Sequence, residues 1–376
     1  MPLEPLASLV MTVSRNLRGR VIRYQPELDG VRALAVCLIV ANHLKVPRVR
    51  DGVEMFFVLS GLLITEVLER RISRPDWRSA FYRRRQARLT PALLVMLVAI
   101  VLIAAMSTVW SVPTWAVLSS ATYTLDLTTI FTGISNTGPL APTWALAAEF
   151  QFYLLWPSVL IWLLARPWTR QRMAGLLVSV AVLDAMLMAA ASDVFSRSFV
   201  AYGPLFRPVI ALPLGAAVAL TGKPTRRGGT VLLIGGAAAI IWSGILGFQD
   251  HLAVSTLLIS MGTAMLLRSL RASNPFLETI RRFLRHRRLT GLGRMGYSVA
   301  LWNLPVIMAA QAIGIDPISN RWWTPLVILA ILGVSFTSFR LIELPFLDWL
   351  SPSGNRGSPR AETPLLDTEP LAGMRL

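Results

Sequence analysis

The sequence predicts an all-α polytopic membrane protein with about ten transmembrane helices and both termini in the cytoplasm. Of its 376 residues, 54% are hydrophobic and 15% are charged, a balance that leaves too little polar surface for soluble domains of this length. Apolar stretches long enough to cross a bilayer recur from Val31 to Trp349. Disordered, collagen-like and disulfide-stapled classes are therefore excluded.

Hydropathy and turn signals place the ten spans at residues 31–44, 53–68, 91–110, 143–165, 173–191, 199–220, 230–248, 251–267, 295–314 and 324–349. With the N-terminus inside, the inner segments hold 29 of the 37 Lys and Arg residues and the outer segments hold five. Insertion retains positive charge on the cytoplasmic side, so both termini are predicted to be inside. The net charge of +17 then reflects topology and attraction to inner-leaflet lipids, not a nucleic-acid partner.

We divide the chain into a cytoplasmic N-terminal arm (1–25), a membrane domain (26–350) and a disordered cytoplasmic tail (351–376). The first twenty residues place a short apolar run before the arginines, which is the wrong order for a secretory signal peptide. The tail is rich in Pro, Gly and Ser, a composition typical of disorder. Residues 111–142 lack Lys and Arg, and we expect either an outer loop or a half-inserted hairpin over a cavity.

Neither a disulfide nor a metal site is indicated. Cys37 is the single cysteine and has no partner. The three histidines are scattered without ligand spacing: His286 lies in an arginine cluster, and His251 lies beside Asp250. We therefore expect no metal cofactor.

His43 is the one histidine within a predicted span. Arg32 precedes it by eleven positions, about three helical turns, so the two side chains point from the same helix face about 16 Å apart. A histidine in a bilayer serves as a proton carrier, a ligand or a packed hydrogen-bonded group. Nearby spans add Glu54, Glu149 and Gln151, and buried carboxylates need partners, which favours a functional site over packing alone.

Four arginines occur at the cytoplasmic entry of the third span, at Arg83, Arg84, Arg85 and Arg88. Arg85 and Arg88 are three residues apart and share a helix face. Forked guanidinium groups suit the phosphates of a diffusible cofactor. A helix end anchored in anionic lipid explains the same run, and without other context it is the simpler interpretation.

Polar groups also interrupt the ninth span, at Tyr297, Ser298, Trp302 and Asn303. In the last span, Arg340 and Glu343 are three residues apart. We expect these two side chains to neutralise each other as part of the scaffold.

Five blocks, in order, resemble those of the membrane-bound acyltransferase 3 family, which includes bacterial O-antigen and peptidoglycan O-acetylases, nodulation-factor acetylases and macrolide acyltransferases. ELDGVRALAVCLIVANH resembles the family's opening, with its arginine and histidine at Arg32 and His43. DGVEMFFVLSGLLIT resembles the second-span motif, and FYRRRQARLTPALL carries the Arg-x-x-Arg signature at Arg85 and Arg88. The remaining blocks are TWALAAEFQFYLLWP, and GYSVALWNLP with IELPF. The resemblance covers most of the chain.

The resemblance implies ten core spans in the bacterial inner membrane and transfer of a short acyl group, acetyl first among them, from cytoplasmic acyl-CoA. The acceptor is expected to be a hydroxyl on a carbohydrate or glycosylated metabolite. Asn303 stands where family members often have histidine, which argues against a second base there. Many members carry an extracellular hydrolase-like domain for which this chain shows no residues, so we expect the membrane domain or a separate protein to handle the acceptor.

The expected donor site opens inward. Arg85 and Arg88, with Arg84 beside them, would hold the phosphates of acyl-CoA. Arg32 would contact the cofactor or stabilise a developing oxyanion, and its distance from His43 favours the cofactor.

The expected catalytic group is His43, acting as general base on the acceptor hydroxyl. Glu149 would orient the imidazole or stabilise its protonated form, with Glu54 as the alternative. Direct transfer and a covalent acyl-histidine relay both remain open, because histidine can also be a nucleophile.

Two other classes of function are considered. A proton-coupled transporter or flippase of a sugar or lipid-linked metabolite would use His43 and Glu149 as a proton relay. A sensor or scaffold would show neither turnover nor acyl-CoA binding. Binding of acyl-CoA discriminates, because transport needs no such site.

Overall fold

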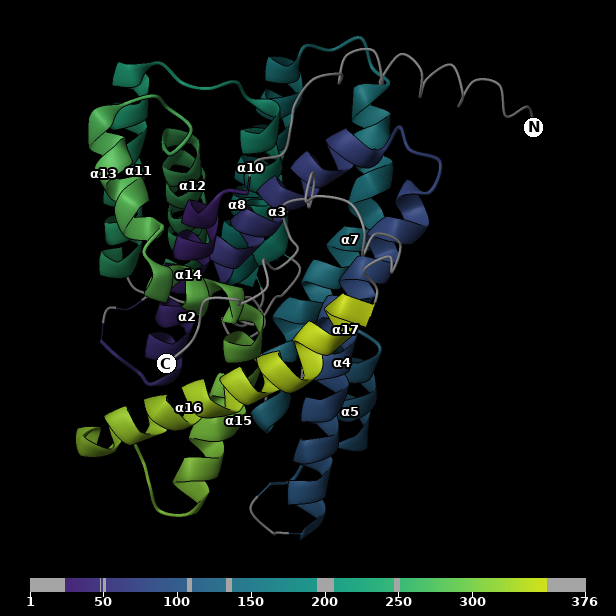
Figure 1. The fold of residues 1–376 in the computed structure, drawn as a ribbon, viewed down its shortest axis with the longest axis vertical. Coiled ribbons are helices and arrows are strands. Elements are labelled where there is room, and N and C mark those ends of the chain that lie inside the picture. Colours follow the sequence, from purple (N-terminus) through teal and green to yellow (C-terminus); the bar gives the residue numbers. More distant parts are fainter. Residues whose placement is uncertain are drawn as a thin grey trace, which may run out of the picture.

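The computed structural model describes residues 24–47, 49, 52–106, 110–132, 137–194, 206–246 and 251–349, which form helices and turns without a β-strand (Figure 1). The helices are α2 (Pro26–His43), α3 (Val53–Arg71), α4 (Trp77–Met106), α5 (Thr114–Ala121), α6 (Leu125–Thr132), α7 (Thr143–Leu164), α8 (Arg170–Val194), α10 (Phe206–Leu220), α11 (Arg226–Leu246), α12 (Leu252–Ser269), α13 (Pro275–Leu284), α14 (Arg287–Arg294), α15 (Gly296–Ala312), α16 (Thr324–Ser338) and α17 (Leu344–Trp349). Short helical turns are η1 (Gly138–Leu140), η2 (Arg321–Trp323) and η3 (Phe339–Glu343).

Six described segments are long and apolar enough to cross a membrane: Trp77–Met106, Gly138–Leu164, Arg170–Ala191, Arg226–Leu246, Leu252–Ser269 and Arg321–Trp349. The predicted all-α, multi-pass class is confirmed, whereas ten spans and cytoplasmic termini stay predictions. Residues 1–23 of the predicted N-terminal arm and the predicted tail at 351–376 lie outside the described residues.

Helices α3 and α10 pack with their backbones in close approach. A Cβ at Gly61 of α3 would collide with the carbonyl oxygen of Leu212, and a Cβ at Gly215 of α10 would collide with that of Val58. Helix α10 also contacts α8 and α12. These contacts bury nearly all of α10 and make it a central element of the bundle.

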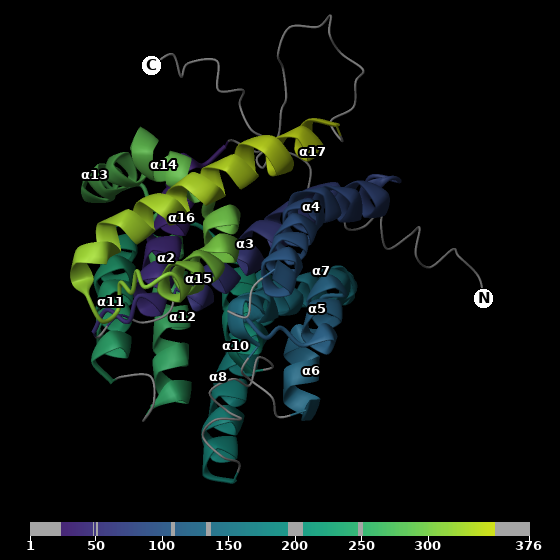
Figure 2. The ribbon, with the colours of Figure 1, turned by 90° about the horizontal axis from the view of Figure 1, so that it is seen from below.

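The N-terminal half of α2 is held by α13 and α14, which lie across one end of the bundle (Figure 2). Gly293 of α14 approaches the backbone of Asp29 so closely that a Cβ would collide with its carbonyl oxygen. Nε of Arg285 donates to Oε2 of Glu27 at 2.9 Å. Helix α15 packs along α2 as well. Contacts with three helices therefore fix the position of α2 in the bundle.

The segment predicted to be an outer loop or a half-inserted hairpin contains α5 and α6. Their connecting turn is packed between α4 and α7, because the Tyr123 hydroxyl hydrogen-bonds the Thr90 hydroxyl at 2.8 Å and the Tyr123 ring stacks on Phe150 with centroids 4.2 Å apart. Gln151 donates to Asp126 of α6 at 2.8 Å. The described part of this segment is therefore helical and packed against α4 and α7, and its depth in the membrane stays a prediction.

The expected pair between Arg340 and Glu343 is wrong. Glu343 is buried and accepts a hydrogen bond from Ser298 of α15, whereas Arg340 is exposed, 6.0 Å from the Phe336 ring centre. Both residues belong to η3, a π-helical turn. A π-helical turn is wider than an α-helical one, so residues three apart no longer share a face.

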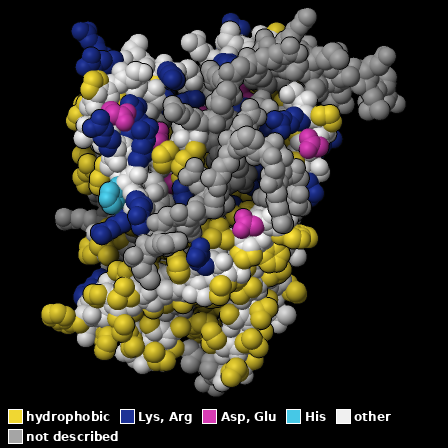
Figure 3. Space-filling view, in the orientation of Figure 1, with side chains coloured by type: hydrophobic (Ala, Val, Ile, Leu, Met, Phe, Trp, Pro, Cys, Tyr) yellow, Lys and Arg dark blue, Asp and Glu magenta, His cyan; other side chains and the backbone are white. Residues whose placement is uncertain are grey.

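The surface shows two regions in the view of Figure 3. Hydrophobic side chains cover the part formed by α15, α16 and the C-terminal half of α4, whereas Lys and Arg side chains gather over α13 and α14. An apolar belt next to a basic end is the pattern expected of a protein that sits in a bilayer.

Candidate active site

His43 is placed by the end of α2. Lys45 adopts a left-handed conformation (φ 54°), and the N–H groups of Lys45 and Val46 return to the carbonyls of Asn42 and Ala41 at 3.0 and 2.9 Å, which ends the helix. The guanidinium of Arg321 donates to the carbonyls that follow His43, at Leu44 and Lys45, at 2.6 and 3.1 Å. His43 therefore lies at a well-anchored helix end.

The imidazole of His43 is hydrogen-bonded through Nδ1 to Oδ1 of Asn303 in α15. Asn303 is fully buried. Its side-chain Nδ2 donates to the carbonyls of Val299 and Ala300 at 2.9 and 2.7 Å. A neutral amide, anchored to its own helix, therefore holds the ring.

Arg32 faces the same neighbouring helix as His43, three turns earlier in α2. Its NH1 forms an ion pair with Oδ1 of Asp29 at 2.5 Å. Its side chain lies against Gly296 of α15, where a Cβ would come within 3.2 Å of Arg32 Cδ. The face of α2 that meets α15 thus carries a cation at one level and an imidazole at another.

Arg85 and Arg88 lie in different surroundings. Arg85 is buried, with its guanidinium 5.5 Å from the ring centre of Phe81 and 5.1 Å from that of Tyr153. Arg88 is half-buried and interacts electrostatically with Arg32 and Arg85. Among the described residues it forms no hydrogen bond and no ion pair, so its N–H donors are available to an anion.

Arg84 is half-buried and belongs to the electrostatic surroundings of Arg85, whereas Arg83 is exposed. The arginine run therefore divides between a part that enters the bundle and a part that faces outward.

Within the described residues, the structure shows no hydrogen bond between Glu149 and His43, and the predicted role of Glu149 in stabilising the protonated imidazole stays a prediction. Glu149 of α7 accepts hydrogen bonds from Ser60 of α3 and from Tyr153, one turn along α7. It interacts electrostatically with Arg32 and Arg85. Glu149 is thus the counter-charge of the arginines, and the position beside Nδ1 of His43 is taken by Asn303.

Glu54, the predicted alternative, is paired with an arginine of another helix. Its carboxylate is fully buried and accepts from Nε of Arg207 at 2.8 Å. The Arg207 guanidinium lies 4.9 Å from the ring centre of Trp144. This ion pair joins α3 to α10 and satisfies a cation in the predicted sixth span.

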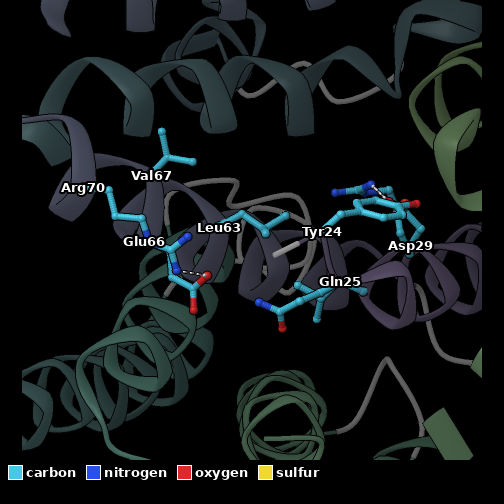
Figure 4. Close-up of a pocket in the computed structure, with 9 residues that line it drawn as sticks. Tyr24, Gln25, Asp29, Leu63, Glu66, Val67 and Arg70 are labelled. Carbon is cyan, nitrogen blue, oxygen red and sulfur yellow. Dashed lines mark hydrogen bonds and ion pairs between the residues drawn. The ribbon is translucent and has the colours of Figure 1, made fainter. Parts of the chain in front are cut away.

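A small pocket opens between the start of α2 and the end of α3 (Figure 4). Figure 4 shows Tyr24 and Asp29 on one side and Glu66 and Arg70 on the other. Arg32 contributes to the lining, so the arginine of the first block borders this pocket.

Sequence reasoning missed Asn303 as the partner of His43, and Ser60 and Tyr153 as the partners of Glu149. Each of the three is a polar residue inside an otherwise apolar block, which is the signal that marks them. Among the described residues, no group of three or more His, Cys, Asp and Glu side chains is placed to hold a metal ion; a metal-free mechanism stays a prediction.

Comparison with known proteins identifies the family. The chain matches the family described as an acyltransferase domain, Acyl_transf_3, over residues 25–340. Similar proteins are peptidoglycan O-acetyltransferase OatA of Listeria monocytogenes (27% identical), putative peptidoglycan O-acetyltransferase YrhL of Bacillus subtilis (29%) and O-acetyltransferase OatA of Staphylococcus aureus (26%).

Each comparison covers 86% of this chain and 56%, 55% and 57% of the respective relative, so the chain spans just over half the length of these relatives. No solved structure matches it. The resemblance carried by the five blocks is confirmed: this multi-pass membrane protein belongs to the acyltransferase 3 family.

Proposed function

We propose that the protein is an O-acyltransferase that moves a short acyl group, acetyl in the first instance, from acyl-CoA to a carbohydrate hydroxyl. Two relatives are named as peptidoglycan O-acetyltransferases, one of them putatively, which supports a glycan of the cell envelope as acceptor. Glycosylated metabolites are the second acceptor class.

The donor site is the arginine group of Arg32, Arg85 and Arg88. Acyl-CoA carries phosphates, and guanidinium groups bind phosphate through charge-assisted hydrogen bonds. Arg88 supports this role most directly, since it is half-buried and its donors are unused within the described chain. The arginine group is held together by Arg85, which is buried and stacked on Tyr153, and by the nearby Glu149.

The catalytic base is His43. It accepts the proton of the acceptor hydroxyl as the hydroxyl oxygen bonds to the acyl carbon. The carbon–sulfur bond of the thioester then breaks, and His43 returns the proton to the departing thiolate. The products are an ester and free CoA, and the imidazole ends neutral.

The observation that carries this proposal is the face of α2 that meets α15. It bears Arg32 beside Gly296 and His43 beside Asn303, about 16 Å apart along the helix. One continuous chamber along this face would bring the phosphates of the donor to the arginines and its thioester to the imidazole.

The proposal includes ten spans, both termini in the cytoplasm and location in the bacterial inner membrane. It is supported by the bias of Lys and Arg towards the predicted inner segments and by the bacterial origin of the relatives.

The test measures acetyl-CoA binding and acetyl transfer by the full chain in lipid nanodiscs. Arg88→Ala is expected to weaken acetyl-CoA binding about tenfold or more, the cost of losing a charged hydrogen bond. Arg83→Ala is the matched control and should bind as the wild type does, because Arg83 is exposed. Equal acetyl-CoA binding by both variants would mean that the arginines anchor the helix end in lipid and do not bind the donor. Sugar transport by a protein that does not bind acetyl-CoA would establish the transporter.

Direct transfer and a histidine relay are separated by incubating the protein with acetyl-CoA and no acceptor. Intact mass followed by peptide mapping would find an acetyl group on His43 in a relay. Direct transfer leaves the protein mass unchanged.

A further inference from the structure

We propose that Asn303 fixes His43 in the tautomer that carries its proton on Nδ1, which makes Nε2 the basic nitrogen of the site. Asn303 would thus be a positioning residue that acts through His43. The role of this tautomer in catalysis rests on the proposed function, but the assignment of the tautomer does not.

The first step is the orientation of the Asn303 amide. Both groups on α15 that lie beside its Nδ2, the carbonyls of Val299 and Ala300, are acceptors, at 2.9 and 2.7 Å. A flipped amide would place its oxygen against two other oxygens and take Nδ2 away from both acceptors. Because Asn303 is fully buried, such a loss is costly. Oδ1 must therefore face His43.

The second step is the proton on the imidazole. Oδ1 of an amide has only lone pairs, so it can accept a hydrogen bond and cannot donate one. The nitrogen in contact with it is Nδ1 of His43. A neutral imidazole carries one N–H, and its position is set by the hydrogen bond that the ring makes. Nδ1 is protonated, and Nε2 keeps its lone pair.

The third step is the consequence for the reaction. Only Nε2 can take the proton of the acceptor hydroxyl, and only Nε2 can carry the acyl group in a relay. Asn303 is neutral, so it orients the ring without supplying a counter-charge to the protonated imidazole, unlike the aspartate of a Ser-His-Asp triad. The carboxylate of Glu149, which was expected beside the ring, accepts hydrogen bonds from Ser60 and Tyr153 instead.

The direct test is ¹⁵N NMR of the imidazole in the full-length protein. The chain has three histidines, so His251→Gln with His286→Gln leaves His43 as the only labelled ring, and both replaced residues are exposed. The expected spectrum at neutral pH has a protonated Nδ1 and an unprotonated Nε2. A protonated Nε2 with a bare Nδ1 would overturn the proposal.

Variants at position 303 test the cause. Asn303→Leu removes the acceptor, so the signal should move towards the Nε2–H form that dominates for a free imidazole in water. Asn303→Asp keeps an oxygen acceptor beside Nδ1 and should keep the Nδ1–H form, at lower stability, because its second oxygen replaces the donor to Val299 and Ala300. Asn42→Leu, one residue from His43 and outside the site, is the matched control. An unchanged tautomer in Asn303→Leu would contradict the assignment.

Kinetics separate positioning from a structural effect. In Asn303→Leu we expect kcat for acetyl transfer to fall by roughly 10- to 10⁴-fold, the upper limit being the cost of a wrong tautomer in a serine-protease triad, with KM for acetyl-CoA unchanged. Asn303→Asp should recover part of kcat. A parallel loss of acetyl-CoA binding would assign Asn303 a structural role. If the tautomer is as stated but His43→Ala transfers normally, the proposed function fails and the tautomer assignment stands.

Discussion

Glu149 and the arginines around it depend on one another. The carboxylate accepts from Ser60 and Tyr153 and faces the charges of Arg32 and Arg85. Removing a charge from such a group leaves the others uncompensated in a medium of low dielectric constant. Glu149 therefore stabilises the site, whereas Arg88 remains available for the donor.

This division of roles predicts the behaviour of Glu149→Gln. The amide can still accept from Ser60 and Tyr153 but carries no charge, so we expect a lower thermal midpoint and acetyl-CoA binding that is unchanged or tighter, because the site becomes more positive. Thermal unfolding and calorimetric titration in nanodiscs measure both. Weaker acetyl-CoA binding by a folded Glu149→Gln protein would show that the assignment is wrong.

The buried pair of Glu54 and Arg207 gives a second prediction. Glu54→Leu should destabilise the fold by about 3–5 kcal/mol, since it leaves a buried cation without its partner. The double variant Glu54→Leu with Arg207→Leu should recover most of that loss. Chemical denaturation in detergent measures the free energy of unfolding of each variant. If the losses caused by the two single replacements add up in the double variant, the two charges are not coupled.

The sequence shows which residues within the predicted spans are polar. It does not show which of these residues pair with one another. The spacing of Arg32 and His43 on one helix follows from 3.6 residues per turn, and both side chains meet α15. The partners of His43 and Glu149 come from contacts between helices far apart in sequence, at Asn303 and Ser60. No local pattern specifies such contacts.

At the scale of helices, close backbone packing sets the positions of the site residues. Gly61 and Gly215 let α3 and α10 approach, and Gly293 does the same for α14 and α2. Small residues at such crossings are typical of membrane helices. The site residues on α2 and α3 are thus held by contacts that have no chemistry of their own.

This packing predicts a contrast between two glycines. Gly215→Ala should destabilise the protein by about 1–3 kcal/mol, because the added methyl has no space. Gly333→Ala in α16 is the control, where a Cβ meets nothing within 4 Å, and it should be neutral or stabilising by up to about 1 kcal/mol. Equal unfolding midpoints for the two variants would refute the packing argument.

The helix ranges themselves show what hydropathy can and cannot locate. Helix α7 (143–164) lies within one residue of its predicted range, whereas α4 begins at Trp77 and not at residue 91, because the arginine run continues the helix beyond the apolar stretch. The last predicted span is divided by η3, a turn whose π geometry has no marker in the apolar pattern.

At the scale of the molecule, polar helices are enclosed by apolar ones. Helices α2 and α3, which carry Arg32 and Glu54, are not among the six segments long and apolar enough to cross a membrane, whereas Arg85 and Arg88 lie on α4, which is one of them. The segments Arg226–Leu246 and Trp77–Met106 are largely exposed, so they present their apolar sides outward. Charged groups are thereby kept away from lipid, where they are costly.

The orientation of the whole molecule can be tested with single cysteines. Cys37 is the only cysteine, so Cys37→Ser provides the background for Arg288→Cys in α14 and Trp322→Cys in η2, both at exposed positions. With cytoplasmic termini, an impermeant maleimide should label position 322 in right-side-out vesicles and position 288 only in inverted ones. The reverse pattern would place the arginine group on the outer side and remove its access to cytoplasmic acyl-CoA.

The most direct measurement compares His43→Ala with the wild type in a single turnover, using labelled acetyl-CoA and glycan chains released from peptidoglycan, with acetyl-CoA binding followed in parallel. Loss of a general base should slow acetyl transfer by about 10²- to 10⁴-fold, while acetyl-CoA binding and the unfolding midpoint stay at wild-type values. Acetyl transfer at the wild-type rate by His43→Ala would contradict the account, because the imidazole held by Asn303 would then have no part in the chemistry.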